Sequence, residues 1–396
     1  MKQSSQVAAL AERGVKFLAP ETVFVAPDVN PERIAPGVVI HPGCRLAGAA
    51  LAIGPDCVLG EEGPVTIRDC QIGAGVRLRG GAFERATMRD GVDGGSCAHV
   101  RFGTLLEEKS QFGHSVGFKQ TVLLPFVTTG SLINFCDVLM AGGTGADNHS
   151  EVGSSYVHFN FTTHQEKATP SLIGDVPRGV MLDQAPIFLG GQGGLVGPCR
   201  IEYGTVLAAG LICRRDVLTP NLLVTPGAAT GPTEREYDAC KMGTVDRRVA
   251  NNLHFIGNLL ALDAWHRQVR ARFVREPWQQ FVHDGALARL DEMFAERIRQ
   301  MAKFSEKTAI SLEHADGAAR ASQQAFVTAW PAMKVALEKM VAARDYRFLT
   351  PSALAALEHS AVSTPDYLSW VRSADYRFLT PWLQGIVDDC TALWTR

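Results

Sequence analysis

The strongest constraint in this sequence is a repeated spacing of aliphatic side chains near its start. These residues recur in steps of six or seven, at Ile34, Ile40, Leu46, Ile53, Leu59, Val65, Ile72 and Leu78. A glycine or alanine often follows them, as in IAPGVV, IGPDCV and IGAGVR. An amphipathic helix would require steps of three and four residues, and a half-buried strand would require steps of two. A step of six fits neither, and it indicates short strands joined by tight corners.

This spacing predicts a left-handed parallel β-helix built from triangular coils. Each side of a coil would be one short strand, with its aliphatic side chain on the axis and a small residue at the corner. Each coil buries its faces only against its neighbours, so several coils must stack. The spacing blurs over residues 85–170 and resumes until about residue 215. A glycine-rich β-sandwich is the alternative, but its strands would alternate with a period of two.

The second half of the sequence has a different period. After the breaker-rich segment Pro226–Pro232, apolar residues step by four, three and four at Val249, Leu253, Ile256 and Leu260. The same spacing recurs over residues 287–301 and 326–340, which indicates amphipathic helices that pack on one another. We therefore expect two domains, a β-helix over residues 20–228 and an α-helical domain over residues 236–396.

Composition excludes several classes of partner. The formal net charge is −2, so neither nucleic acid nor an anionic membrane surface is expected to bind. No apolar run approaches the roughly 18 residues that would suggest a membrane span. Glu12 and Arg13 lie where a signal peptide would need apolar residues. The 9 cysteines are scattered, without a CxxC, as is typical of the reduced cytoplasm, so we expect a cytoplasmic protein without metal or a tightly bound cofactor.

Polar side chains crowd residues 97–170, where a purely structural array would need few ionisable groups. They include Cys97, His99, Arg101, His114, Lys119, Asn134, Asp137, Asp147, Asn148, His149, His158, Asn160, His164 and Lys167. This stretch is the candidate site.

The segment HVRFGTLLEEKSQFGHSVGFK, from His99 to Lys119, resembles the acetyltransferase half of the bifunctional bacterial enzyme that makes UDP-N-acetylglucosamine. The shared pattern is an Arg-x-Gly element, then an acidic-apolar coil, then a Val-Gly coil that ends in lysine, and the spacing from arginine to lysine matches the family without a gap. The resemblance implies that Arg101 and Lys119 bind the phosphate of an amino-sugar phosphate or nucleotide sugar. A guanidinium fork and an ammonium group suit a phosphoryl group.

The segment SSYVHFNFTTHQEKATPSLIGD resembles a loop of the same family, in which an Asn-Tyr pair and a lysine precede an Ile-Ile-Gly-Asp coil. By this resemblance Asn160 and Phe161 border the acyl-CoA site, and Lys167 is a third phosphate-binding residue. The family's Gly-rich pyrophosphorylase domain has no counterpart here. We therefore expect no pyrophosphorylase activity from this sequence.

One departure from the family concerns the catalytic base. The coil that carries the family's catalytic histidine aligns with residues 131–137, which places Asn134 on the histidine and Asp137 on the sugar-binding tyrosine. An amide cannot accept a proton as a neutral imidazole can. Asp137 and His149 are the nearest replacements, and His158 or His164 could also serve.

Two functions remain open. The leading hypothesis is a transferase that uses acetyl-CoA or another acyl-CoA to acylate an amino-sugar phosphate or nucleotide sugar, in a homotrimer with ligands between the chains. The alternative is a non-catalytic nucleotide-sugar sensor or scaffold that has lost the catalytic histidine. A third use of His114, His149, His158 and His164 would be a metal site between subunits, which we do not predict because FNFTTH lacks the flanking repeat pattern.

Overall fold

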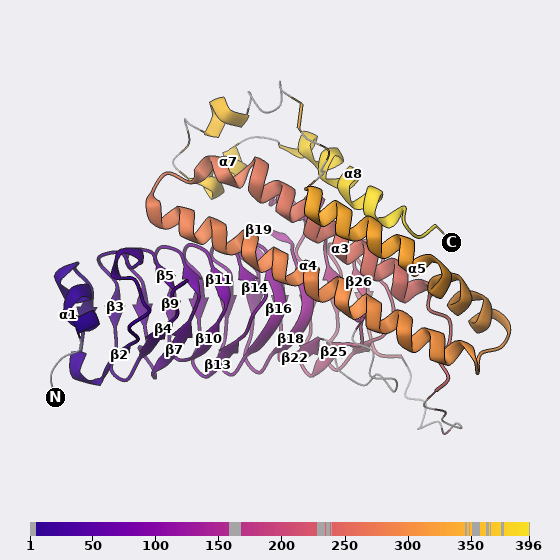
Figure 1. Cartoon of the computed structure of the whole chain (residues 1–396), viewed down its shortest axis with the longest axis horizontal. Coiled ribbons are helices and arrows are strands. Elements are labelled where there is room, and N and C mark those ends of the chain that lie inside the picture. Colours follow the sequence, from indigo (N-terminus) through magenta and orange to yellow (C-terminus); the bar gives the residue numbers. More distant parts are fainter. Residues whose placement is uncertain are drawn as a thin grey trace.

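The computed structural model describes residues 5–157, 168–227, 234, 238, 240–344, 347, 349–350, 357–361, 364, 366–373 and 376–395. It is a left-handed parallel β-helix of about 11 turns, followed by a C-terminal region of several helices. Figure 1 shows the coils stacked along the long axis, with helix α4 lying obliquely across them. The predicted fold class is confirmed.

The strands form the three faces of the β-helix. Face 1 is an 11-stranded sheet of β1 (Lys16–Phe17), β3 (Val39–Ile40), β6 (Val58–Leu59), β9 (Arg77–Leu78), β12 (Asp93–Gly94), β15 (Gln111–Phe112), β17 (Thr128–Thr129), β21 (Glu151–Val152), β24 (Phe188–Leu189), β27 (Val206–Leu207) and β29 (Leu223–Val224). Face 2 consists of β2 (Phe24–Val25), β4 (Arg45–Ala47), β7 (Val65–Arg68), β10 (Gly81–Glu84), β13 (Ala98–Val100), the first halves of β16 (Gly117–Leu123) and β18 (Asn134–Met140), then β22 (Ser155–Val157), β25 (Gly193–Leu195) and β28 (Ile212–Cys213). Face 3 consists of β5 (Ala52–Ile53), β8 (Gln71–Ile72), β11 (Ala86–Met88), β14 (Thr104–Leu106), the second halves of β16 and β18, β23 (Ser171–Ile173) and β26 (Arg200–Ile201).

Parallel register stacks equivalent side chains into inward columns. On face 2 the column includes Leu46, Ile67, Phe83, Val100, Phe118, Phe135, Val157 and Leu195, all buried. The rings of Phe118 and Phe135 have centroids 6.0 Å apart. Leu46 pairs with Ile67 and not with Val65, because Val65 and Ile67 both point inward on a longer strand. The predicted apolar positions therefore do form the core, with this one shift in register.

The corner between faces 2 and 3 repeats an unusual backbone conformation. Its residues have positive φ in successive coils, with +50° at Asp69, +47° at Arg85, +70° at Gly103, +51° at Gln120 and +59° at Asp137. This region is strained for most side chains and is tolerated best by Gly, Asn and Asp. The stacked corner forms an edge along which helix α4 can lie.

The helical region packs on face 3. Its elements are α3 (Asp246–Gln268), η3 (Arg270–Phe273), α4 (Pro277–Leu312), α5 (Gly317–Ala343), α7 (Tyr367–Ser373), η4 (Arg377–Leu379) and α8 (Thr380–Thr391). Within the β-helix lie η1 (Pro20–Thr22), η2 (Pro31–Arg33), α2 (Val176–Gly179), and the hairpin of β19 (Gly143–Gly145) with β20 (Asn148–His149), while α1 (Ser5–Glu12) precedes the first coil. Helix α4 contacts β5, β8, β11 and β14, and α3 contacts β23. No helix in the described part of the chain is long and apolar enough to cross a membrane.

Adjacent pairs of apolar residues explain why face 3 needs this cover. Neighbouring side chains in a strand point to opposite faces, so one residue of each pair turns outward. The outward residues Leu105, Val122, Leu139 and Leu172 are nevertheless at most 4% exposed. Burying each of these side chains stabilises the folded state by roughly 1.5–3 kcal/mol. This burial holds the helical region on the β-helix. Side chains such as His99 on face 2 and Val206 on face 1 remain exposed.

We predict that Gly285→Ala loosens this packing. A methyl carbon on Gly285 of α4 would lie 2.8 Å from Cβ of Gln71, which is buried on face 3. Although alanine favours helices, this overlap should lower the free energy of unfolding by about 1–3 kcal/mol. Thermal denaturation checks this, with Gly243→Ala as the control, because an added methyl there meets nothing within 4 Å. A Gly285→Ala protein as stable as the control would contradict the packing.

Candidate functional site

The open surface of face 2 gathers residues from the two motifs that the sequence singled out. Residues two apart in a strand point the same way, so His99 and Arg101 project together. The register pairs His99 with Gly117 and Gly117 with Asn134, and it pairs Lys119 with Cys136. We call this set the face 2 patch, made of His99, Arg101, Gly117, Lys119, Asn134 and Cys136.

Arg101 and Lys119 are neighbours in adjacent coils. Val100 pairs with Phe118, and the Arg101 N–H donates to the Phe118 carbonyl at 2.9 Å. Parallel strands lie about 4.8 Å apart, so the two cationic side chains start from neighbouring positions. Among the described residues neither cation has an ion-pair partner, and Arg101 Nε is buried without a hydrogen-bond partner. Lys119 Nζ lies 4.7 Å from the centroid of the Phe102 ring. The positive charges of Arg101 and Lys119 are therefore not neutralised by an ion pair among the described residues, which suits the binding of a phosphate.

The thiol of Cys136 lies beside these cations. Burial, and then the Asp137 carboxylate, raise the pKa of Cys136, while Arg101 and Lys119 act in the opposite direction. Because the net shift is upward, the thiol stays protonated near neutral pH and is a poor nucleophile. Arg101, Lys119 and Asp137 therefore all lie close enough to this thiol to affect it electrostatically.

The imidazole of this patch belongs to His99, which sequence reasoning did not select as a base. Gly117 separates His99 from Asn134 on the same outward column, and a methyl on Gly117 would lie 3.2 Å from Asn134 Oδ1. Tyr156 follows Asn134 on the next coil and is 50% exposed. The His-x-Arg spacing was the available signal, since it places both side chains on one face of a strand.

Asp137 occupies the corner next to the patch and contacts the helical region. Arg297 of α4 donates from Nη2 to Asp137 Oδ1 at 2.6 Å, and Arg297 is 1% exposed. This ion pair joins α4 to the coil that carries Asn134. The predicted candidate base therefore serves at least as a structural tie between the two parts of the chain.

His149 lies at a different corner. Its strand β20 belongs to the hairpin inserted between β18 on face 3 and β21 on face 1, and its Nδ1 is 2.7 Å from the Ala146 carbonyl oxygen. The structure does not bring His149 to Arg101 and Lys119 within one chain. Five further predicted site residues lie outside the described residues. They are the candidates His158, Asn160, Phe161 and His164, and the predicted phosphate ligand Lys167.

The metal hypothesis involved His114 as well. His114 Nδ1 is 2.7 Å from Ser131 Oγ of the next coil. Within the described ranges no group of three or more His, Cys, Asp or Glu residues could hold a metal ion.

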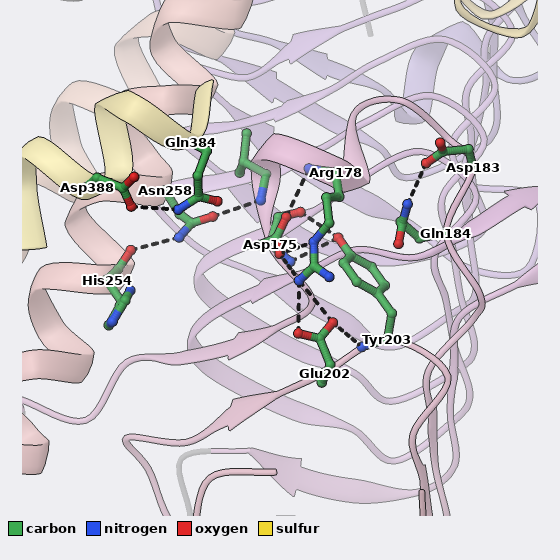
Figure 2. Close-up of polar contacts among 11 residues, drawn as sticks. Asp175, Arg178, Asp183, Gln184, Glu202, Tyr203, His254, Asn258, Gln384 and Asp388 are labelled. Carbon is green, nitrogen blue, oxygen red and sulfur yellow. Dashed lines mark hydrogen bonds and ion pairs between the residues drawn. The ribbon is translucent and has the colours of Figure 1, made fainter. Parts of the chain in front are cut away.

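A second polar cluster lies near the last coils, and its charges are already paired (Figure 2). Arg178 donates from Nε to Asp175 at 2.7 Å and from Nη2 to Glu202 at 2.9 Å. The Tyr203 hydroxyl donates to the Asp175 carbonyl at 2.6 Å. Asn258 of α3 accepts the Val176 N–H at 2.7 Å. This network fixes α2 against the β-helix and α3, which contrasts with the uncommitted cations of the face 2 patch.

Comparison with known proteins finds similarity over the β-helix. No family model matches the chain. The bifunctional protein GlmU of Pelobacter propionicus is 30% identical over 213 residues, covering 54% of this chain and 41% of that protein. GlmU of Thermotoga sp. strain RQ2 is 28% identical over 209 residues, covering 52% of this chain and 41% of that protein. The chain thus spans less than half the length of the curated relatives it matches.

Among solved structures, LpxA from Acinetobacter baumannii aligns with 11% identity and a TM-score of 0.23, covering 52% of this chain and 70% of that one. The sequence matches agree with the resemblance carried by the segments from His99 to Asp175. Over about half of its length, the chain is therefore similar to the left-handed β-helix acetyltransferases of the GlmU type.

Proposed function

We propose that the chain transfers an acyl group from acyl-CoA to an amino-sugar phosphate or nucleotide sugar bound on the face 2 patch. One observation carries the proposal: His99, Arg101 and Lys119 project together from adjacent coils of a face that the helices leave open. Similarity to GlmU proteins supports acyl transfer to a sugar derivative in general terms. Acyl-CoA as the acyl donor, and an amino-sugar phosphate or nucleotide sugar as the acceptor, are part of what we propose.

The patch would bind its acceptor through the phosphate. Arg101 offers a planar fork and Lys119 a mobile ammonium group, and together they would balance most of a phosphate's charge. Tyr156 would offer an aromatic surface to the sugar ring. Lys167 is proposed as a third phosphate ligand, and Asn160 and Phe161 as the border of the acyl-CoA site, on the strength of the sequence resemblance.

The proposed chemistry uses His99 as general base. The neutral imidazole would accept a proton from the acceptor amine while its nitrogen attacks the thioester carbonyl. The amide N–H of Asn134 would donate to the oxygen that becomes negative. Collapse of this intermediate breaks the carbon–sulfur bond, and the departing CoA thiolate takes the proton from His99. Asp137, which Arg297 engages, and His149 at its separate corner remain the other predicted bases.

A non-catalytic sensor or scaffold is the second candidate function. The observation in its favour is Asn134 at the position of the family's catalytic histidine. In that case the face 2 patch would bind the same sugar phosphates, and the helical region would contact a partner. Release of CoA thiol separates the two functions, because only a transferase produces it.

We predict that His99→Gln and Arg101→Ala affect different steps. Removing the guanidinium should weaken binding of glucosamine 1-phosphate or UDP-N-acetylglucosamine about 10- to 100-fold, as measured by calorimetry. Removing the imidazole should leave that affinity unchanged and slow thiol release from acetyl-CoA about 100- to 10,000-fold. Arg45→Ala is the matched control, since Arg45 lies on the same face several coils away. Equal ligand affinity in wild type and Arg101→Ala would refute the phosphate site, and absence of thiol release in wild type would favour the sensor.

A third substitution tests whether Asp137 is structural or catalytic. Asp137→Asn keeps a residue that tolerates positive φ but leaves Arg297 buried without its carboxylate, so stability should fall by about 3–5 kcal/mol. Adding Arg297→Met should restore much of the stability, because no unpaired charge then remains. If the double variant is stable and retains thiol release, Asp137 is structural. A stable double variant without activity would instead make Asp137 the base and count against His99.

We also propose the predicted homotrimer, formed through the open faces. Phe188, Val206 and Leu223 stack on the last coils of face 1 and are 40%, 36% and 68% exposed, and such apolar columns are typical of subunit contacts. Sedimentation should give three times the mass of the chain, and Val206→Glu should shift it to monomer. Val335→Glu, at an exposed position on α5, should remain trimeric. A monomeric wild type would contradict the assembly.

A further inference from the structure

A cavity of about 660 Å³ lies between the β-helix and the helical region. Its β-helical side is the corner between faces 3 and 1, where Gly91, Lys109 and Phe126 stack with φ of +69°, +56° and +69°. The face 2 patch lies on another side of the triangle, so the two sites are distinct. A cavity of this size lies within the range of small-molecule sites.

The helical wall of the cavity supplies apolar surface. Trp278 of α4 is partly buried and lines the cavity together with Phe273 of η3 and Leu368 of α7. An aromatic wall of this kind suits the face of a ring, whether a sugar or a base.

The acidic groups of the cavity accept hydrogen bonds from other residues of the protein or form ion pairs with its arginines. Asp366 accepts hydrogen bonds from N and Oγ of Ser369 at 2.9 and 2.7 Å. Asp90 accepts from the Ala74 N–H at 3.0 Å. Glu108 is paired with Arg89 at 2.7 Å and with Arg270. Although burial alone would raise it, the guanidinium groups of Arg270 and Arg89 lower the pKa of Glu108 to about 2, so this carboxylate stays charged and paired.

Two basic groups of the cavity are not engaged in this way. Across the ranges that the structure describes, neither Lys109 nor Arg372 has an ion-pair partner. The Arg372 guanidinium carbon lies 6.0 Å from the centroid of Phe126, and the Phe126 N–H donates to the carbonyl of Glu108, which precedes Lys109. The two cations therefore approach the same corner, one from α7 and one from the β-helix.

We propose that this cavity binds an organic phosphate, with the phosphate between Lys109 and Arg372 and the ring against Trp278. The shared chemistry fits a sugar phosphate or a nucleoside monophosphate. Such a ligand would contact both parts of the chain at once. This site is independent of the function proposed for the face 2 patch.

The test uses full-length protein that carries Arg101→Ala and Lys119→Ala, so that the face 2 patch does not contribute. Calorimetry with glucose 1-phosphate, uridine 5′-monophosphate and inorganic phosphate should show that at least one organic phosphate binds better than inorganic phosphate. Adding Lys109→Met or Arg372→Met should weaken that binding about 10-fold or more. Lys339→Met is the matched control, because Lys339 is exposed on α5 outside the cavity.

The organic ligands also distinguish the source of the ring. Tighter binding of uridine 5′-monophosphate indicates a nucleotide, and tighter binding of glucose 1-phosphate indicates a sugar phosphate. Trp278→Phe should weaken the preferred organic ligand and leave inorganic phosphate unchanged. The proposal is overturned if no probe binds, if inorganic phosphate binds as tightly as both organic ligands, or if binding survives Lys109→Met and Arg372→Met in protein with an unchanged melting temperature.

Discussion

The coil-to-coil register is the constraint on which the rest of the structure depends. Each strand hydrogen-bonds in parallel to the equivalent strand of the next coil, so every position in a coil becomes part of a column. Inward columns form the core, and outward columns form rows of side chains on the surface of the three faces. A one-residue shift in register would turn Leu46, Phe118 and their equivalents outward. The same hydrogen bonds that stabilise the fold therefore hold Arg101 beside Lys119.

The helical region determines which of these outward rows remain accessible to a ligand. Helices α4 and α3 cover face 3 and leave face 2 open, where the polar residues of the middle coils lie. The ion pair between Arg297 and Asp137 then sets where α4 meets the corner. Its desolvated charges have to be paired with each other, because either one alone would be strongly unfavourable in a buried position.

The sequence predicted the core columns better than the site, for a physical reason. Steps of six reveal inward residues such as Ile40 and Ile53, because each coil repeats the same local geometry. The pattern blurs after residue 85 where outward residues such as Leu105 and Val122 become apolar as well, and their cover comes from helices far along the chain. The partner of Asp137 is Arg297, 160 residues away, so no local motif could have shown that this carboxylate ties two parts of the structure together. His99 was detectable from its spacing to Arg101, but only once the open face was known.

Whether a charged cluster is structural or binds a ligand depends on how its charges are satisfied. Around Asp175, Arg178 and Glu202 the donors and acceptors meet one another, so the cluster gains nothing from a ligand (Figure 2). At Arg101 and Lys119, and again at Lys109 and Arg372, two cations of neighbouring elements lie near one another, and none of the four forms an ion pair among the described residues. Convergent like charges repel each other, so a fold that holds them together gains from an anion that neutralises both. Arg101 and Lys119 both lie on face 2, where the register fixes the separation of their backbones before any ligand arrives, so little ordering remains to oppose binding. Arg372 approaches Lys109 from α7, so the geometry of that pair depends instead on how the helical region packs on the β-helix.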